Sequence, residues 1–288
     1  MTAPAPTSIQ LPPGHLCVTT YGSVTWETTQ ALLQLQRRVV TSGLANAITW
    51  DFVPGNLVDK ARNEAVHRML ANAQSQFLVQ IDADMTFPPT ILETLLVTAY
   101  HELPWADIVG AWCPLRGEPY LPTIDTGTGT WEPTLPNIGP LEVIRTGGAC
   151  VLTKRHVFER MEAPWYGVRP APRPLDTLAE FDNYCRIKFD GRNPFMHMRE
   201  WEQISQCAVE DAQNQRGQNP RGLFGSHLAT VGEDSNFCDK ARALGFRIVV
   251  QTNAVCGHVD RKIITPADHK DAMKRAEEQE LLACGVTG

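Results

Sequence analysis

The sequence predicts an α/β fold in which a mostly parallel central sheet is flanked by helices. Short apolar runs alternate with helix-periodic segments over the first 112 residues. The chain has 288 residues, which is long enough for one large α/β domain or two small ones. Its hydrophobic fraction of 43% and its charged fraction of 20% are ordinary for a soluble protein. A globular domain with a substantial core is therefore expected.

The first half supplies the regular part of this pattern. Its expected strands are residues 16–20, 47–52, 77–81 and 107–112. Its expected helices, where apolar residues recur at helical spacing, are residues 27–40, 56–73 and 89–101. Such alternation is typical of parallel strands joined by crossover helices. We expect residues 15–112 to form one half of a single domain, after a loose tail over residues 1–14.

The regular alternation stops after residue 112. Residues 113–140 are rich in Pro, Gly and Thr, which predicts loops and short hairpins. Further strands are expected at residues 141–146, 149–153, 246–250 and 254–255, and helices at residues 154–161 and 235–244. We expect residues 113–262 to form the second half, with a loop-rich insertion at 163–231 that holds one helix near residues 199–214. A polar-faced helix at 266–283 is expected within a C-terminal segment, residues 263–288.

Charge and cysteine content narrow the functional class. The net charge is −6, so no overall basic field draws the chain to nucleic acid or to an anionic membrane. The eight cysteines are scattered without a Cys-x-x-Cys pair, which gives a zinc site no support. We expect reduced, partly buried thiols in a cytoplasmic protein. No apolar stretch approaches the ~20 residues that span a bilayer, so no membrane span is expected.

Two carboxylates follow the third expected strand. Asp82 and Asp84 stand directly after the apolar run at residues 77–81, and Pro88 and Pro89 then open a helix. Carboxylates at the carboxyl end of a strand lie in the crevice where open α/β sheets bind ligands. Two such oxygen ligands suit Mg²⁺ or Mn²⁺, an ion that is usually shared with substrate phosphates. This motif therefore indicates phosphate-bearing substrates and metal-assisted chemistry.

Three further sequence features follow Asp84 along the chain. Gly147 and Gly148 lie between two short strands, where a bare backbone can approach a ligand closely. Glu233 and Asp234 stand at the start of a helix, where an anion is favoured and a carboxylate can serve as a cap. His258 follows the last strand, and Arg261 and Lys262 come just beyond it. Each feature alone is common, but the ordered set of four is considerably more specific.

In this order the four features resemble the GT-A glycosyltransferases, most closely the family-2-like bacterial and phage branch. The resemblance runs from about Leu16 to Lys262, without residues 163–231. It implies a GT-A fold, which is Rossmann-like. It also implies a glycosyltransferase that uses Mn²⁺ or Mg²⁺ to move a sugar from a UDP- or GDP-linked donor to a hydroxyl acceptor. Inversion at the sugar carbon is expected, because Asp234 holds the position of the general base.

The resemblance also implies roles for individual residues. Asp84 and His258 would ligate the metal, and Asp82 would hold ribose and metal. Asp234 would be the general base, next to Glu233. Most of the expected donor-binding residues follow from the resemblance, and cationic stabilisation of the leaving diphosphate suggests Lys262. The donor-binding set is Thr20, Gly22, Asp51, Arg62, Asp82, Asp84, Gly147, Gly148 and Lys262.

Two other enzyme classes stay open. The segment Asp82-Ala-Asp84-Met-Thr86 also matches the haloacid-dehalogenase pattern, in which Asp82 would be a covalent nucleophile of a phosphohydrolase and Asp239 part of a later acidic pair. That motif normally lies on the first strand, whereas two strand-helix units precede it here. A nucleotidyltransferase would share the nucleotide-binding half, but it has no need of a base on the acceptor side. A non-catalytic sugar-nucleotide binder would not need Asp234.

The acceptor is the least constrained part of the prediction. Residues 145–199 hold ten Lys and Arg against six Asp and Glu, with aromatic residues among them. Interleaved aromatic and basic residues suit nucleic acid, since aromatic rings stack on bases and cations meet phosphates. They equally suit sugar rings or a small core. A hydroxymethylated pyrimidine in phage DNA, within the host cytoplasm, is one hypothesis for the acceptor, and a saccharide is another.

Overall fold

The computed structural model describes residues 11–20, 22–44, 47–55, 57–117, 119–128, 131–170, 230–259, 263–267 and 269–274. The chain divides into two compact units, one of residues 1–167 with 233–288 and the other of residues 168–232. The first unit holds the central sheet and every element that positions the candidate site. In the second unit the structure describes one antiparallel pair, β10 (Arg169–Pro170) with β11 (Thr230–Val231).

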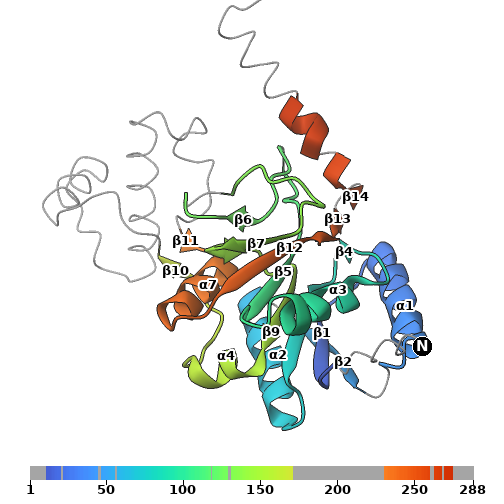
Figure 1. Cartoon of the computed structure of the whole chain (residues 1–288), viewed down its shortest axis with the longest axis vertical. Coiled ribbons are helices and arrows are strands. Elements are labelled where there is room, and N and C mark those ends of the chain that lie inside the picture. Colours follow the sequence, from blue (N-terminus) through green and yellow to red (C-terminus); the bar gives the residue numbers. More distant parts are fainter. Residues whose placement is uncertain are drawn as a thin grey trace, which may run out of the picture. The chain divides into compact units, whose positions relative to one another are not determined.

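A seven-stranded sheet forms the centre of the first unit, in the order β2-β1-β3-β9-β5-β12-β7 (Figure 1). The strands are β1 (Gly14–Thr20), β2 (Ile48–Pro54), β3 (Phe77–Asp82), β5 (Ile108–Trp112), β7 (Pro140–Val143), β9 (Cys150–Lys154) and β12 (Ile248–Val255). Strand β1 is parallel to β2 and β3, and β5 is parallel to β12, whereas β9 and β7 run antiparallel to their neighbours. The carboxyl ends of β1, β2, β3, β5 and β12 therefore share one edge with the amino ends of β9 and β7.

Helices cover both faces of this sheet. On one face lie α1 (Trp26–Thr41) and α3 (Ile91–Val97), and on the other lie α2 (Val58–Ala71), α4 (Arg155–Arg160) and α7 (Glu233–Ala243). Successive side chains of a strand point to opposite faces. In β1, Leu16 and Val18 accordingly join the core beneath α1, while Cys17 joins the core beneath α2. The central strands β1, β3, β5 and β9 thus pack on both sides, as their continuous apolar runs predict, whereas the edge strands β2 and β7 are partly exposed.

A small three-stranded sheet at the carboxyl edge carries the expected histidine. It joins β4 (Met85–Thr86), β13 (Gly257–Val259) and β14 (Ile263–Ile264). His258 pairs with Met85 in antiparallel register, one residue beyond Asp84. A second small pair joins β6 (Ile124–Asp125) to β8 (Arg145–Thr146), directly before the two glycines. Short pairings after the main strands therefore bring distant parts of the chain to one edge.

The element boundaries differ from expectation in three places. The strands expected at residues 246–250 and 254–255 form the single strand β12, with a register shift between Gln251 and Val255. The helix expected at 89–101 is α3 followed by a π-helical turn, η1 (Thr98–Glu102). The strand expected at 141–146 divides into β7 and β8. Residues 266–267 and 269–274 are helical, while the rest of the terminal helix and the helix expected near 199–214 lie outside the described residues.

The cysteines that the structure describes are buried, as expected for small hydrophobic side chains: Cys17, Cys113, Cys150, Cys238 and Cys256.

Among the described helices, none combines the length and apolar character needed to cross a membrane.

Candidate functional site at the carboxyl edge of the sheet

A buried arginine joins the first predicted carboxylate to the start of α7. The Arg62 Nη2 atom donates to both Asp82 oxygens at 3.1 Å, and Nη1 donates to the Gly148 carbonyl at 2.6 Å. Its Nε lies 3.5 Å from Glu233 Oε1. The Thr19 hydroxyl donates to Asp82 Oδ1 at 2.8 Å. We call these five residues the Arg62 cluster. They come from α2, β3, the glycine turn, α7 and β1, so this cluster ties five parts of the fold together.

Charge and burial oppose each other inside the Arg62 cluster. Burial disfavours the charged guanidinium, but the carboxylates of Asp82 and Glu233 hold the pKa of Arg62 above its ordinary value. Burial raises the pKa of Glu233, and Arg62 works against that rise. An ion pair so enclosed depends on both partners, since removal of either leaves an uncompensated charge.

The predicted base, Asp234, adjoins this cluster. Its Oδ2 accepts from the Gly148 backbone N–H at 3.3 Å, and its Oδ1 accepts from the Ser235 N–H at 2.6 Å. The second contact is the expected carboxylate at a helix amino end. Both carboxylate oxygens are thereby oriented by backbone groups. A carboxylate held in a fixed position beside a glycine turn is suited to receive a proton from a bound hydroxyl.

The two adjacent glycines are each required by a protein side chain. A Cβ built on Gly148 would lie 1.6 Å from Arg62 Nη1, and one built on Gly147 would lie 2.6 Å from the Thr123 hydroxyl. Real Cβ atoms essentially never make contacts this short. The close approach that the sequence suggested for a ligand is therefore made, in this structure, by Arg62 and Thr123.

A second, more exposed group of residues contains the other predicted metal ligands. His258 Nε2 lies 3.6 Å from Asp84 Oδ1, although 174 positions separate the two residues. Arg116 donates from Nε to His258 Nε2 at 3.1 Å and from Nη2 to Asp84 Oδ2. The Val259 N–H donates to the Asp84 carbonyl at 2.7 Å, which holds the two chain segments together. We call Asp84, Arg116 and His258 the Arg116 cluster.

The Arg116 cluster fits a divalent cation by its donor set. Both Asp84 and His258 already accept from a positively charged group, and a carboxylate with an imidazole suits Mn²⁺. No group of three or more His, Cys, Asp or Glu side chains in the described residues is arranged to hold a metal. A cation here would take its remaining ligands from substrate phosphate and water, as Mg²⁺ usually does.

Three expected donor-binding residues take other positions. Thr20 and Gly22 form the turn after β1, where the Gly22 N–H donates to the Thr20 hydroxyl at 3.2 Å and Gly22 has a φ of +106° that favours glycine. Asp51 lies within β2 rather than at its end, and it accepts from Arg68 Nη1 at 2.7 Å. Asp51 also lies 3.9 Å from His15, so its side-chain partners among the described residues belong to neither the Arg62 nor the Arg116 cluster.

Part of the expected site lies outside the described residues. Arg261 and Lys262 fall there, as do all the aromatic and basic residues of the expected insertion beyond residue 170. Trp165 and Tyr166, which the sequence grouped with them, are instead core residues. Tyr166 stacks on Phe237 with ring centroids 4.5 Å apart, and its hydroxyl donates to Gln80 Oε1 at 2.6 Å. The Tyr166 ring stabilises the packing of α7, whereas Trp165 packs against Phe158 of α4, with ring centroids 6.1 Å apart.

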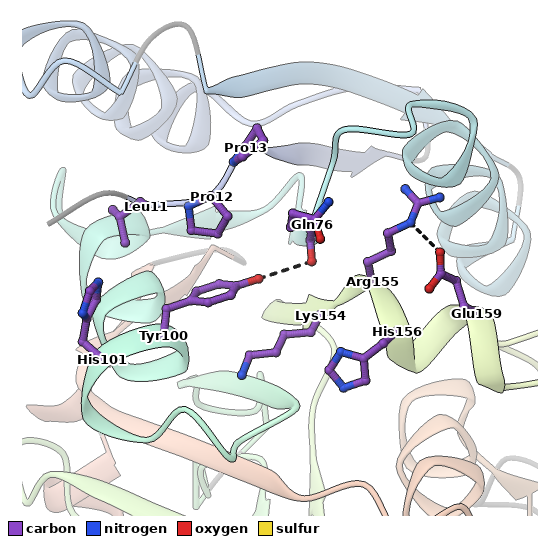
Figure 2. Close-up of a pocket in the computed structure, with 10 residues that line it drawn as sticks. All are labelled: Leu11, Pro12, Pro13, Gln76, Tyr100, His101, Lys154, Arg155, His156 and Glu159. Atoms are coloured by element: carbon purple, nitrogen blue, oxygen red, sulfur yellow. Dashed lines mark hydrogen bonds and ion pairs between the residues drawn. The ribbon is translucent and has the colours of Figure 1, made fainter.

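A hollow of about 710 Å³ lies at the opposite edge of the sheet (Figure 2). Most of its polar side chains already have protein partners. Lys154 donates to the Pro104 carbonyl, His156 contacts Asp107, and Arg155 contacts Glu159. None of the predicted site residues lines this hollow. We assign it no ligand.

The phosphohydrolase alternative expects Asp239 beside Asp82. Instead, the Asp239 carboxylate accepts from Arg145 Nε at 2.7 Å and from Arg145 Nη2 at 3.0 Å. Arg145 lies on β8 and Asp239 on α7, so this bidentate pair fastens the helix to the small sheet. The observed pairing is structural and gives the alternative no support.

The site residues expected from the sequence include neither Thr19 nor Arg116. Thr19 was detectable in principle, because it faces Asp82 in the parallel register of β1 and β3. Arg116 follows β5, which lies two positions away from β3 in the sheet. Only assembly of the whole sheet brings Arg116 to Asp84. A cation beyond a strand end is too common a feature to be selected from sequence alone.

No protein-family profile and no curated protein matches this sequence. Several solved structures do match it. One, the crystal structure of A197 from STIV, is 16% identical, with a TM-score of 0.50 over 88% of this chain and 91% of that chain. A glycosyltransferase involved in glycosylation of the major capsid of PBCV-1 is 10% identical, with a TM-score of 0.31 over 53% of this chain and 70% of that chain.

Another is glucosyl-3-phosphoglycerate synthase from Mycobacterium tuberculosis, in complex with Mn²⁺, UDP-glucose and phosphoglyceric acid. It is 12% identical, with a TM-score of 0.31 over 76% of this chain and 87% of that chain. At 16% identity the likeness to A197 from STIV shows the fold alone. The α/β fold expected from the sequence is confirmed: the described residues form a mostly parallel seven-stranded sheet flanked by helices.

Proposed function

We propose that this protein is a glycosyltransferase that uses a divalent cation and a nucleotide-diphosphate sugar, with UDP- and GDP-linked sugars as the candidate donors. The observation that carries the proposal is the meeting of Asp84 with His258, 3.6 Å apart, beside the Arg62 cluster and Asp234. Phosphate ligands, a cation and a base are the three elements that sugar transfer from a diphosphate requires. Asp84, His258 and Asp234 lie at the carboxyl edge of one sheet, where open α/β folds bind ligands, and this supports the proposal.

We assign the cation to Asp84 and His258, with Mn²⁺ or Mg²⁺ as the candidates. Negative charge on the leaving diphosphate is neutralised by this cation when it is bound. Asp82 contributes differently, because Arg62 and Thr19 hold its carboxylate in place. We assign Asp82 to the donor ribose, for which a fixed carboxylate is a hydrogen-bond acceptor.

We assign the general base to Asp234. Its two backbone contacts fix it beside Gly148, on the side of the site where the acceptor would lie. It would accept the proton of the acceptor hydroxyl as the bond to the sugar carbon forms. That placement favours inversion. Glu233 would act as a positioning residue, since its carboxylate pairs with buried Arg62.

The acceptor proposal rests on the basic composition of residues 145–199. A hydroxymethylated pyrimidine in DNA is our first candidate and a saccharide hydroxyl the second. Binding to duplex DNA across a salt series separates them, because phosphate contacts weaken steeply with salt. A protein that fails to bind duplex at low salt excludes the first candidate.

The proposal is tested by thermal shift with UDP, GDP and their sugars, each with and without Mn²⁺. A ligand that binds the native state raises the melting temperature. We expect one nucleotide to act in a Mn²⁺-dependent way and to lose its effect in Asp84→Ala and His258→Ala. The matched control is Asp271→Ala, which removes an exposed carboxylate from the terminal helix.

The base assignment needs a second measurement. Asp234→Asn keeps the shape and one acceptor oxygen, so it should retain nucleotide binding while sugar transfer falls by about 10²- to 10⁴-fold. Full transfer by Asp234→Asn would show that the base lies elsewhere. Absence of any nucleotide shift, together with turnover of a simple phosphate ester, would replace the proposal by a phosphohydrolase.

A further inference from the structure

Arg116 lies between the two side chains to which we assign the cation. Its Nε donates to His258 Nε2 at 3.1 Å, and its Nη2 donates to Asp84 Oδ2. The same His258 Nε2 atom is 3.6 Å from Asp84 Oδ1. A positive group of the protein therefore engages both groups that a cation would need.

The histidine tautomer supports this arrangement. His258 Nδ1 lies 3.0 Å from the carbonyl oxygen of Pro114, which can only accept, so Nδ1 carries the proton and donates. The Nε2 lone pair is then directed at Arg116, whose Nε can only donate. A histidine fixed by a backbone carbonyl at one nitrogen, with a lone pair at the other, has the arrangement typical of a metal ligand.

We propose that Arg116 holds the place of the divalent cation between Asp84 and His258 in the ligand-free protein, and moves to the donor diphosphate when the cation binds. This inference rests on the proposed function. It makes Arg116 a positioning residue that couples cation binding to nucleotide binding.

The loop that carries Arg116 limits the movement to the side chain. Pro114 bridges to Pro122, and the Leu115 N–H donates to the Leu121 carbonyl at 2.9 Å, so the backbone on both sides is paired. The Arg116 side chain itself is 53% exposed. Its guanidinium can therefore leave the cluster without any break in the fold.

Electrostatics favours the exchange. A cation bound by Asp84 and His258 repels a guanidinium only a few ångströms away and takes the lone pair to which Arg116 donates. The diphosphate that comes with the cation supplies a new anion at the same edge. Arginine binds phosphate oxygens in a bidentate way and is suited to that second position.

The test measures Mn²⁺ binding directly, from the electron paramagnetic resonance signal of free Mn²⁺, in wild type and Arg116→Gln. Without nucleotide, Arg116→Gln should bind Mn²⁺ about three- to tenfold more tightly, because the competing charge is gone. With saturating Mn²⁺, it should bind UDP or GDP about three- to tenfold more weakly, since a phosphate contact is lost. Arg37→Gln, which removes an exposed arginine from α1, controls for the change in net charge and should behave as wild type.

The outcomes separate this inference from the proposed function. If Mn²⁺ binding depends on Asp84 and His258 but is equal or weaker in Arg116→Gln, Arg116 does not hold the cation's place and only this inference fails. If Mn²⁺ binding is absent, or unaffected by Asp84→Ala and His258→Ala, the metal assignment fails and this inference falls with it. Opposite changes in Mn²⁺ and nucleotide affinity support both.

Discussion

Two arginines bridge predicted site residues at the same edge of the sheet, yet they differ in burial. The Arg62 side chain is 4% exposed and contacts Asp82, Glu233 and the Gly148 carbonyl. The Arg116 side chain is 53% exposed and contacts Asp84 and His258. The chemistry of the two clusters is similar, but the solvent around them is not. Burial makes the Arg62 contacts hard to exchange, whereas exposure leaves the Arg116 contacts open to replacement.

This difference assigns the two carboxylates of one short motif to separate tasks. Asp82 and Asp84 are two positions apart and almost equally exposed, with 23% and 24% of their side chains accessible, but the first pairs with a buried arginine and the second with an exposed one. Asp82, held by Arg62, orders the frame of the site. Asp84, held by the exposed Arg116, stays available to a cation. A buried ion pair is costly to break, while an exposed pair contributes little to stability.

The largest expected effect comes from removal of the buried arginine. Arg62→Gln leaves the Asp82 and Glu233 carboxylates without their cation, so the free energy of unfolding should fall by about 3–5 kcal/mol. Urea denaturation measures it. Arg116→Gln is the matched exchange in the exposed cluster and should cost less than about 1 kcal/mol. Equal losses in the two variants would break the comparison, because burial would then not distinguish the clusters.

Much of the fold was predictable because its central strands are buried on both faces. Continuous apolar runs such as residues 77–81 identify such strands, and alternation with helices gives the parallel order. The antiparallel position of β9 between β3 and β5 was not predictable, since no local signal gives strand order. That position is what places Gly148 at the same edge as Asp82.

The site was predictable only to the level of residue type. The order of Asp82, Gly148, Asp234 and His258 along the chain indicated one site, but not which partners each would have. The burial of Arg62 follows from packing of α2 against the sheet, and the pairing of Arg116 follows from the position of β5. Both depend on contacts between residues far apart in sequence. The hydrophobic periodicity of a sequence gives no information on such long-range contacts.

An intermediate effect is expected from the glycine that adjoins the buried cluster. Gly148→Ala would place a Cβ 1.6 Å from Arg62 Nη1, so the guanidinium must move away from Asp82. We expect a loss of about 1–3 kcal/mol in the free energy of unfolding, as for other overpacked sites. The matched control is Gly167→Ala, where a Cβ meets no atom within 4 Å. That exchange should stay within about 0.5 kcal/mol of wild type. A Gly148→Ala protein as stable as the control would show that Arg62 is not confined as the structure indicates.

The smallest effect concerns a third arginine-carboxylate pair at the other end of the sheet. Arg68 binds Asp51, and buried His15 lies 3.9 Å from the same carboxylate with neither ring nitrogen hydrogen-bonded. Burial lowers the pKa of His15 below its ordinary value; Asp51 opposes this change and Arg68 adds to it. At His15, unlike at Arg62, burial outweighs the neighbouring carboxylate. His15 therefore extends the comparison of burial and charge to a side chain whose ordinary pKa is near neutral.

A histidine that must stay neutral in the folded protein makes stability depend on pH. The unfolded chain binds a proton at His15 below about pH 6.5, whereas the folded protein resists it. The stability that depends on a neutral His15 should therefore be fully present above about pH 6.5. The free energy of unfolding should decline as the pH falls below that value. His15→Gln cannot bind this proton, so between pH 7.5 and 5 its loss of stability should be smaller than that of wild type by roughly 1 kcal/mol. Urea denaturation at each pH measures the two curves. A parallel decline in both proteins would mean that His15 is protonated in the folded state, and that Asp51, not burial, determines its charge.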